Sequence, residues 1–169
     1  MYLYILRHAE AHDLGYSGIE KDFDRPLTDY GERQARKAGK ALRKLDVKLE
    51  GILSSPLVRA LQTAQSLAEK MEYEGKVLTS DALRPGMDRD SLRKELSKFE
   101  VDSHVLIVGH QPDLGEYIQY LISGTKGKGL ALDKAGIACL KINGPLAEPE
   151  KVSLIWLLNY LLVEMIAEG

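Results

Sequence analysis

The stretch LYILRHAEA, residues 3–11, is an apolar run that stops abruptly at an arginine and a histidine. Residues 2–6 have the apolar and aromatic composition of a short buried strand, after which a turn residue such as Gly, Asn or Asp would be ordinary. Arg7 and His8 stand there instead. Two bulky polar side chains at the end of a buried strand indicate a functional edge of a sheet, and their partners are expected at the ends of other strands.

The rest of the chain alternates apolar runs with helical patterns. Further strands are predicted at residues 51–53, 76–78 and 104–108. Four stretches carry apolar residues three or four positions apart, as helices do: Ala35–Leu45 behind an N-cap at Thr28, Leu57–Met71 behind Pro56 in the first turn, Leu92–Phe99, and Pro112–Leu121. This alternation predicts an α/β fold with a mostly parallel central sheet.

Two more strands are predicted near the end of the chain. Residues 137–142 and 152–158 bracket NGPLAEPE (143–150), which has the composition of a hairpin loop or a longer sheet connection. The apolar stretch 154–163 is broken by Asn159 and closed by Glu164, so we expect a core strand that leads into a terminal helix rather than a span of about 20 residues. With no internal repeat and no linker, a single domain over residues 1–169 is expected.

Composition narrows the classes of partner and the compartment. A formal net charge of −2 provides no general attraction to nucleic acid or to an anionic membrane, so neither is expected as a partner. The lone Cys139 cannot form an internal disulfide, and the first residues have neither the charged segment nor the cleavage site of a signal peptide. A reducing, cytoplasmic location is therefore expected.

Four polar residues are predicted to meet at one edge of the sheet. In open α/β sheets the ligand crevice lies beyond the carboxyl ends of the strands, where helix N-termini also point. Arg7 and His8 follow the first strand, Arg59 lies in the first turn of the helix after the second, and His110 follows the strand at 104–108. Each residue alone would be an ordinary surface side chain. Together they predict an anion-binding site.

The residue types indicate phosphoryl chemistry. Arg7 and Arg59 offer charged, forked donors that match phosphate oxygens. Their charges disfavour protonation of His8, which leaves a neutral imidazole able to attack phosphorus and form a phosphohistidine. His110 would donate hydrogen bonds to the equatorial oxygens of the transferred group. This chemistry needs no metal ion and no other cofactor.

These motifs resemble the histidine phosphatase superfamily, also called the phosphoglycerate mutase-like superfamily. LRHAEA (6–11) is similar to its Arg-His signature, and the next three blocks follow in the family's order: RPLTDYGERQA (25–35), LSSPLVRALQTA (53–64) and VLIVGHQPDL (105–114). The resemblance implies a three-layer α/β/α sandwich, a phosphohistidine on His8, and a phosphate pocket of Arg7, Arg59 and His110. The short chain, the Ala after Arg-His and the RPLT block most resemble the small branch typified by SixA phosphohistidine phosphatases.

One departure from the family's pattern bears on the substrate. Members that act on phosphate esters usually carry a general-acid glutamate just after the third strand, where this chain has DALRPGMD (81–88) with Pro85 in the glutamate's place. An imidazole leaving group needs less protonation than an alkoxide, so the absence favours phosphohistidine or another phosphoramidate. Asp88 or Asp81 could still fold back as the acid, although loop aspartates more often form caps and turns.

The polar loop that leaves the catalytic edge contains further candidate residues. Arg25 is a candidate for phosphate binding, with pairing to Asp22 or Asp24 as the alternative. Substrate specificity is expected in residues 11–27, which could close over the site, and near residues 124–130. A metal site built from the four histidines is disfavoured because His104 belongs at the start of its strand, far from the others.

The sequence thus predicts a metal-independent, cofactor-independent phosphohistidine phosphatase acting on a phosphorylated protein. A phosphatase or mutase for small phosphate esters is the alternative within catalysis, and a non-catalytic phosphate-recognition module is the alternative outside it. Detection of an acid-labile phosphoenzyme would distinguish an enzyme from a recognition module. Recognition of an anion alone would need arginines and amides but no nucleophilic His8.

Overall fold

The computed structural model describes residues 1–125, 127, 130–144 and 151–169. The predicted alternation of strands and helices is confirmed, with three short 3₁₀ helices in the connections. In chain order the elements are β1 (Tyr2–Arg7), η1 (Tyr16–Gly18), η2 (Asp22–Asp24), α1 (Asp29–Lys44), β2 (Gly51–Ser54), α2 (Val58–Met71), β3 (Val77–Thr79), η3 (Asp81–Leu83), α3 (Arg89–Leu96), β4 (His104–Gly109), α4 (Asp113–Ser123), β5 (Ile137–Ile142), β6 (Val152–Leu158) and α5 (Tyr160–Glu168).

The six strands form one sheet in the order β3-β2-β4-β1-β5-β6. The pairs β2–β3, β2–β4 and β1–β4 are parallel, whereas β5 runs antiparallel to both β1 and β6. The prediction of a mostly parallel central sheet is therefore confirmed. The two strands predicted near the end of the chain are confirmed, and they pair with each other, while residues 145–150 of their connection lie outside the described residues.

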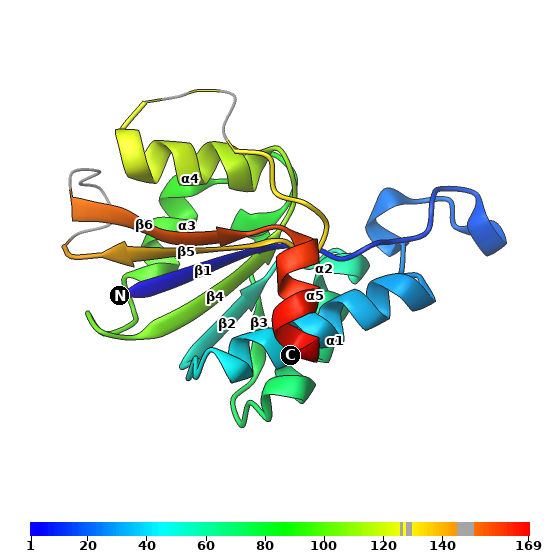
Figure 1. Ribbon diagram of the computed structural model, residues 1–169. Helices are drawn as coiled ribbons and strands as arrows, with labels where there is room; N and C mark the ends of the chain where they lie inside the picture. Colours follow the sequence, from blue (N-terminus) through cyan, green and yellow to red (C-terminus); the bar gives the residue numbers. More distant parts are fainter. Residues whose placement is uncertain (126, 128–129, 145–150) are drawn as a thin grey trace.

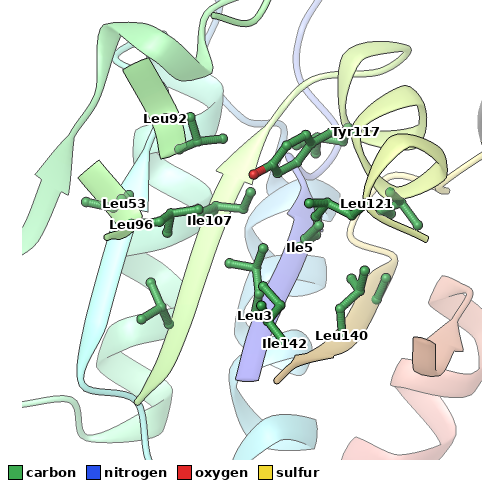
Figure 2. Close-up of a cluster of buried hydrophobic side chains, with 14 of the residues drawn as sticks. Leu3, Ile5, Leu53, Leu92, Leu96, Ile107, Tyr117, Leu121, Leu140 and Ile142 are labelled. Carbon is green, nitrogen blue, oxygen red and sulfur yellow. The ribbon is translucent and has the colours of Figure 1, made fainter. Parts of the chain in front are cut away.

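Helices cover both faces of this sheet and complete the three layers (Figure 1). On one face α3 and α4 pack over a core that includes Leu3 and Ile5 of β1, shown in Figure 2. On the other face α1, α2 and α5 pack over a core that includes Tyr4 and Leu6. Because side chains alternate along a strand and both faces are covered, β1 reads as a continuous apolar run. Burial of this kind holds the strand end at Arg7 in a fixed place.

The stretch at residues 154–163 divides between the end of β6 and the start of α5, as expected from the break at Asn159. Asn159 caps α5, since its side chain accepts a hydrogen bond from the backbone N–H of Leu162. Within the described ranges, no helix combines the length and apolar character that crossing a bilayer requires.

The start of α1 packs against the chain just beyond His8. Thr28 is the N-cap, as predicted, and its Oγ1 accepts a hydrogen bond of 2.9 Å from the N–H of Gly31. A Cβ atom at Gly31 would lie 1.9 Å from the carbonyl oxygen of Glu10, so no larger residue fits at this position without a shift of main chain. The close approach ties the first turn of α1 to the segment that follows His8.

Three predicted boundaries were wrong by a few residues. Leu57 is extended and acts as the N-cap of α2, so Pro56 precedes the helix instead of lying in its first turn. The third helix ends at Leu96, and Phe99 lies beyond it, where its ring packs against Gly51. The short strand β3 begins at Val77 rather than at Lys76. Differences of one or two residues are ordinary at the ends of helices and strands.

Candidate active site

The carboxyl ends of three adjacent strands bring the predicted residues together. β2, β4 and β1 are parallel neighbours, and Arg7 is in register with Gly109. The backbone N–H of His8 donates to the carbonyl of Gly109 at 3.0 Å, so His8 and His110 follow paired positions on β1 and β4. Their rings lie 5.1 Å apart, centroid to centroid. The predicted meeting of these junctions at one edge is thus found in the structure.

Two hydrogen bonds fix the tautomer of His8. Its Nδ1 lies 2.7 Å from the carbonyl oxygen of Ala9, and because a carbonyl only accepts, Nδ1 carries the hydrogen. Its Nε2 accepts a hydrogen bond of 3.3 Å from Nε of Arg59. In the neutral ring the lone pair therefore lies on Nε2, on the side of the arginine. Nε2 is therefore the ring nitrogen that can act as a nucleophile once Arg59 releases it.

The environment of His8 keeps the ring neutral. Burial is the largest cause that lowers its pKa, and the charges of Arg59 and Arg7 lower it further, while the hydrogen bond to the Ala9 carbonyl opposes them; the resulting pKa is about 4. The sequence-based explanation relied on the arginines alone, and burial is the larger cause. His8 thus has an unprotonated Nε2 at neutral pH.

Arg59 lies in the first turn of α2 with its side chain 6% exposed. Besides its contact with His8, it donates from Nη1 to the carbonyl oxygen of Asp22 at 2.7 Å and from Nη2 to the carboxylate of Asp22 at 2.9 Å. Both outer nitrogens of the guanidinium therefore hold one residue of η2. Asp22 was not among the predicted site residues, and its position in a polar loop that leaves the catalytic edge is the sequence signal for it.

Arg7 and His110 each have a polar atom without a partner in the described chain. Arg7 donates from Nη1 to the carbonyl oxygen of Leu132 at 2.8 Å, while its buried Nε has no hydrogen-bond partner among the described residues. His110 has its Nε2 2.8 Å from Oγ of Ser55, and within the same described residues its buried Nδ1 is unpaired. Buried polar groups normally have partners, so these atoms are suited to contact a bound anion.

Ser55 determines what His110 can do. Burial lowers the pKa of His110 most and the neighbouring His8 lowers it further, to about 3, so the ring is neutral and has one N–H. The Oγ of Ser55 accepts a weak hydrogen bond from the N–H of Leu57 at 3.4 Å, which leaves its own hydrogen free to point to Nε2 of His110. In that tautomer, Nδ1 carries the hydrogen and can donate to an oxygen of a bound group.

A buried hydroxyl joins the two halves of the site. Thr63 Oγ1 accepts a hydrogen bond of 3.0 Å from the N–H of Ala9 and donates one of 2.6 Å to the carbonyl oxygen of Arg59. Thr63 is fully buried. It therefore links the residue after His8 directly to the first turn of α2. Sequence reasoning did not single out Thr63, since a threonine one helical turn after an arginine carries no distinctive pattern.

Two other candidate residues, Arg25 and Asp88, bind other partners. Arg25 pairs with Asp22 at 2.9 Å and with Asp13 at 3.4 Å. The pairing with Asp22 is one of the two that were expected as the alternative to phosphate binding. Asp88 is the N-cap of α3 and accepts hydrogen bonds from the N–H groups of Asp90 and Ser91. Hydrogen bonds from Ser91 lower its pKa, so Asp88 is ionised at neutral pH and has no proton to donate.

Two further residues have partners outside this cluster. Asp81 forms an ion pair of 2.7 Å with Arg84. His104 begins β4 at the opposite end of the sheet, where its Nδ1 is 2.9 Å from the hydroxyl of Tyr4. In the parts of the chain that the structure describes, no three His, Cys, Asp or Glu side chains gather into a group that could hold a metal ion.

The sequence matches a known family over the segment that contains Arg7, His8 and Arg59. Residues 3–85 match the model of the histidine phosphatase superfamily (branch 1). The chain therefore belongs to the histidine phosphatase superfamily, as the four sequence blocks indicated.

Among its relatives is an uncharacterized protein of Picosynechococcus sp., 38% identical over 143 residues that make up 83% of this chain and 85% of that protein. The mitochondrial serine/threonine-protein phosphatase Pgam5 of Drosophila mojavensis is 30% identical over 150 residues, with 72% of this chain and 49% of that protein covered. This chain thus spans about half the length of the Pgam5 relative.

Similar solved structures have the same fold over nearly the whole chain. The protein histidine phosphatase SixA complexed with tungstate superposes with a TM-score of 0.81 at 22% identity, covering 95% of this chain and 98% of that one. A putative SixA of Agrobacterium tumefaciens gives a TM-score of 0.69 at 23% identity, covering 93% and 96%. At this identity the likeness shows the fold alone.

Proposed function

We propose that this chain is a phosphohistidine phosphatase that removes the phosphoryl group from a histidine of another protein through a phosphohistidine on its own His8. The proposal assigns His8 as the nucleophile and Arg7, Arg59 and His110 as the groups that bind the phosphoryl oxygens. It is supported by the tautomer of His8, by the convergence of these side chains at one sheet edge, and by membership of the histidine phosphatase superfamily.

In the first step, Nε2 of His8 attacks the phosphorus of the substrate, and the P–N bond of the substrate breaks. Its electron pair stays on the substrate ring. When the second nitrogen of that ring is protonated, the ring leaves as neutral imidazole, and no proton has to be supplied during the step. The transfer from one imidazole to another is chemically symmetric, so the leaving group is no more basic than the nucleophile. Nδ1 of His8 keeps its hydrogen bond to Ala9 throughout.

In the second step, water attacks the phosphorus of phosphorylated His8 opposite the P–N bond. The bond breaks, its electron pair returns to Nε2, and both hydrogens of the water remain on the dihydrogen phosphate that leaves. Donors aimed at the phosphoryl oxygens stabilise the charge that develops in both steps. One pre-organised donor of this kind contributes roughly 10²–10³-fold in rate.

The choice of substrate rests on one observation: the carboxylates that follow β3 already have other partners. Asp88 caps α3, Asp81 pairs with Arg84, and Pro85 is exposed and has no proton to give. An alkoxide leaving group of a phosphate ester requires a general acid, which contributes about 10²–10⁴-fold. An imidazole leaving group does not. The arrangement thus favours a P–N over a P–O bond.

A phosphoserine or phosphothreonine phosphatase is the second candidate, because Pgam5 of Drosophila mojavensis is named a serine/threonine-protein phosphatase. Two peptides of one sequence, phosphorylated on histidine in one and on serine in the other, separate the candidates. We expect kcat/KM to be about 10²-fold higher for the phosphohistidine peptide, the lower end of the contribution of a missing general acid. Equal rates on the two peptides would rule out the proposed substrate class, and a His8→Ala control excludes a contaminating phosphatase.

A further inference from the structure

The carboxylate of Asp22 holds the part of Arg59 that a phosphoryl group would need. Nη2 of Arg59 donates to Oδ2 of Asp22 at 2.9 Å, and Nη1 donates to the carbonyl oxygen of the same residue at 2.7 Å. The other carboxylate oxygen, Oδ1, accepts a hydrogen bond of 2.9 Å from Nη1 of Arg25. Asp22 therefore occupies both outer nitrogens of the guanidinium, which are the donors that match phosphate oxygens in a fork.

Asp22 belongs to a loop whose two ends are joined to each other by backbone hydrogen bonds. Ala11 and Leu27 form an antiparallel bridge, and the backbone N–H of His12 donates to the carbonyl of Pro26 at 2.9 Å. We call residues 12–26 the 12–26 loop. Figure 1 shows its blue ribbon extending to the right, away from the three layers. Within this loop Gly15 has a φ of +87° and nothing within 4 Å of an added Cβ, so it lies in open space.

The geometry allows another anion to replace Asp22 on Arg59. The side chain of Asp22 is 48% exposed, whereas that of Arg59 is 6% exposed, so the carboxylate approaches a buried cation from the solvent side. Partial burial raises the pKa of Asp22, but hydrogen bonds from Arg25 and Arg59 outweigh it and hold the pKa below its usual value. The group is thus an anion at neutral pH. A carboxylate brings one negative charge, and a phosphoryl group brings close to two with three acceptor oxygens.

We propose that Asp22 is an internal competitor for the phosphoryl site, a residue that must leave the fork of Arg59 before a phosphoryl group can bind. The inference rests on the proposed function only in taking Arg59 as a phosphoryl-binding residue. It gives Asp22 a role in setting the affinity, because the affinity for phosphate is multiplied by the fraction of molecules in which the fork is free.

The test is the affinity for inorganic phosphate, measured by isothermal titration calorimetry on the full chain. Asp22→Asn keeps the shape of the side chain and removes its charge. Because exposed ion pairs contribute modestly, we expect phosphate to bind about 5-fold more tightly to this variant than to the wild type. Asp24→Asn is the matched control, since Asp24 lies in the same 3₁₀ turn, is exposed, and forms no ion pair with any described residue. Its affinity for phosphate should equal that of the wild type.

Two outcomes overturn the inference. Weaker phosphate binding by Asp22→Asn would mean that Asp22 positions Arg59 for the anion instead of competing with it. Equal binding would mean that the carboxylate does not oppose the anion at all. Neither result depends on turnover. If the protein hydrolysed phosphoserine as fast as phosphohistidine, the proposed substrate class would be wrong, but the binding experiment would still test the role of Asp22. Absence of phosphate binding in all three proteins would instead overturn both proposals.

Discussion

Nε of Arg59 donates a hydrogen bond to Nε2 of His8 across 3.3 Å, which joins the end of β1 to the first turn of α2. The two residues are 51 positions apart in the chain and meet because β1 and β2 flank β4 in one parallel arrangement. The guanidinium thus lies beside the lone pair that would attack phosphorus. Before Nε2 can attack a phosphoryl group it must release this hydrogen bond, because that nitrogen has a single lone pair.

Replacement of the nucleophile should abolish turnover. We expect His8→Ala to lower kcat by at least about 10³-fold, because the covalent route is lost and the remaining donors only bind the substrate. Brief incubation with labelled phosphohistidine peptide and quenching in alkali should leave label on the wild type and none on the variant. The control is His104→Gln, at the far end of the sheet, which should keep its label. A labelled His8→Ala protein would place the nucleophile elsewhere.

Removal of the arginine clamp should reduce the rate and leave the fold intact. Arg59→Ala should lose about 10²-fold or more in kcat/KM, since a pre-organised charged donor disappears from the transition state. Arg59→Lys should recover little, because a lysine cannot form a fork of two parallel hydrogen bonds. Steady-state kinetics with Arg36→Ala, a partly exposed arginine paired with Glu32 and Glu69, provides the control. A near-normal rate for Arg59→Ala would contradict its assignment.

The buried histidine should make the protein less stable in mild acid. The pKa of His8 falls from the ordinary value of 6.5 to about 4 on folding, so between these values the unfolded chain binds more protons than the folded one. Stability is unaffected by this group above pH 6.5 and falls as the pH drops through that window. At pH 5 the loss is about 2 kcal/mol from His8 alone.

Urea unfolding at pH 7.5 and pH 5 measures that loss. His8→Gln removes the titrating ring, so its free energy of unfolding should change less between the two pH values than that of the wild type by about the same amount. Carboxylates that titrate in this range affect both proteins alike and cancel in the comparison. An identical pH dependence in the two proteins would show that His8 titrates normally in the folded state.

The hydroxyl of Thr63 should stabilise the junction of β1 and α2. Thr63→Val keeps the shape of the side chain and leaves the buried N–H of Ala9 without its acceptor, so we expect a loss of about 1–3 kcal/mol in the free energy of unfolding. Thr79→Val, at an exposed position on β3, is the matched control and should not be destabilised. An unchanged urea midpoint for Thr63→Val would indicate that another group satisfies Ala9.

The sequence predicts the elements of this fold well where local pattern dominates. Leu3 and Ile5 alternate with Tyr4 and Leu6 because β1 is covered on both faces, and Thr28 caps α1 through a contact only three residues away. Those signals are local, so they can be read without the fold. The convergence of Arg7, His8, Arg59 and His110 also follows from a general rule about strand ends in parallel sheets.

What the sequence did not reveal depends on the path of the backbone. Asp22 reaches Arg59 across 37 positions through a loop without regular strands, and no periodicity encodes that approach. Thr63 and Ser55 act on the site through single hydroxyls whose partners lie on other elements. Asp88 illustrates the opposite case, because its hydrogen bonds to Asp90 and Ser91 are local and follow from ordinary capping chemistry.

The bridge between Ala11 and Leu27 makes the 12–26 loop a tether. On the inference drawn for Asp22, the carboxylate is therefore present beside Arg59 at an effective concentration that no dilution of the protein can reduce. The same tether acts at the end of a catalytic cycle, when inorganic phosphate has formed. A group held in reach of Arg59 can take back the guanidinium as soon as phosphate loosens, so the loop that resists entry of an anion would also hasten departure of the product.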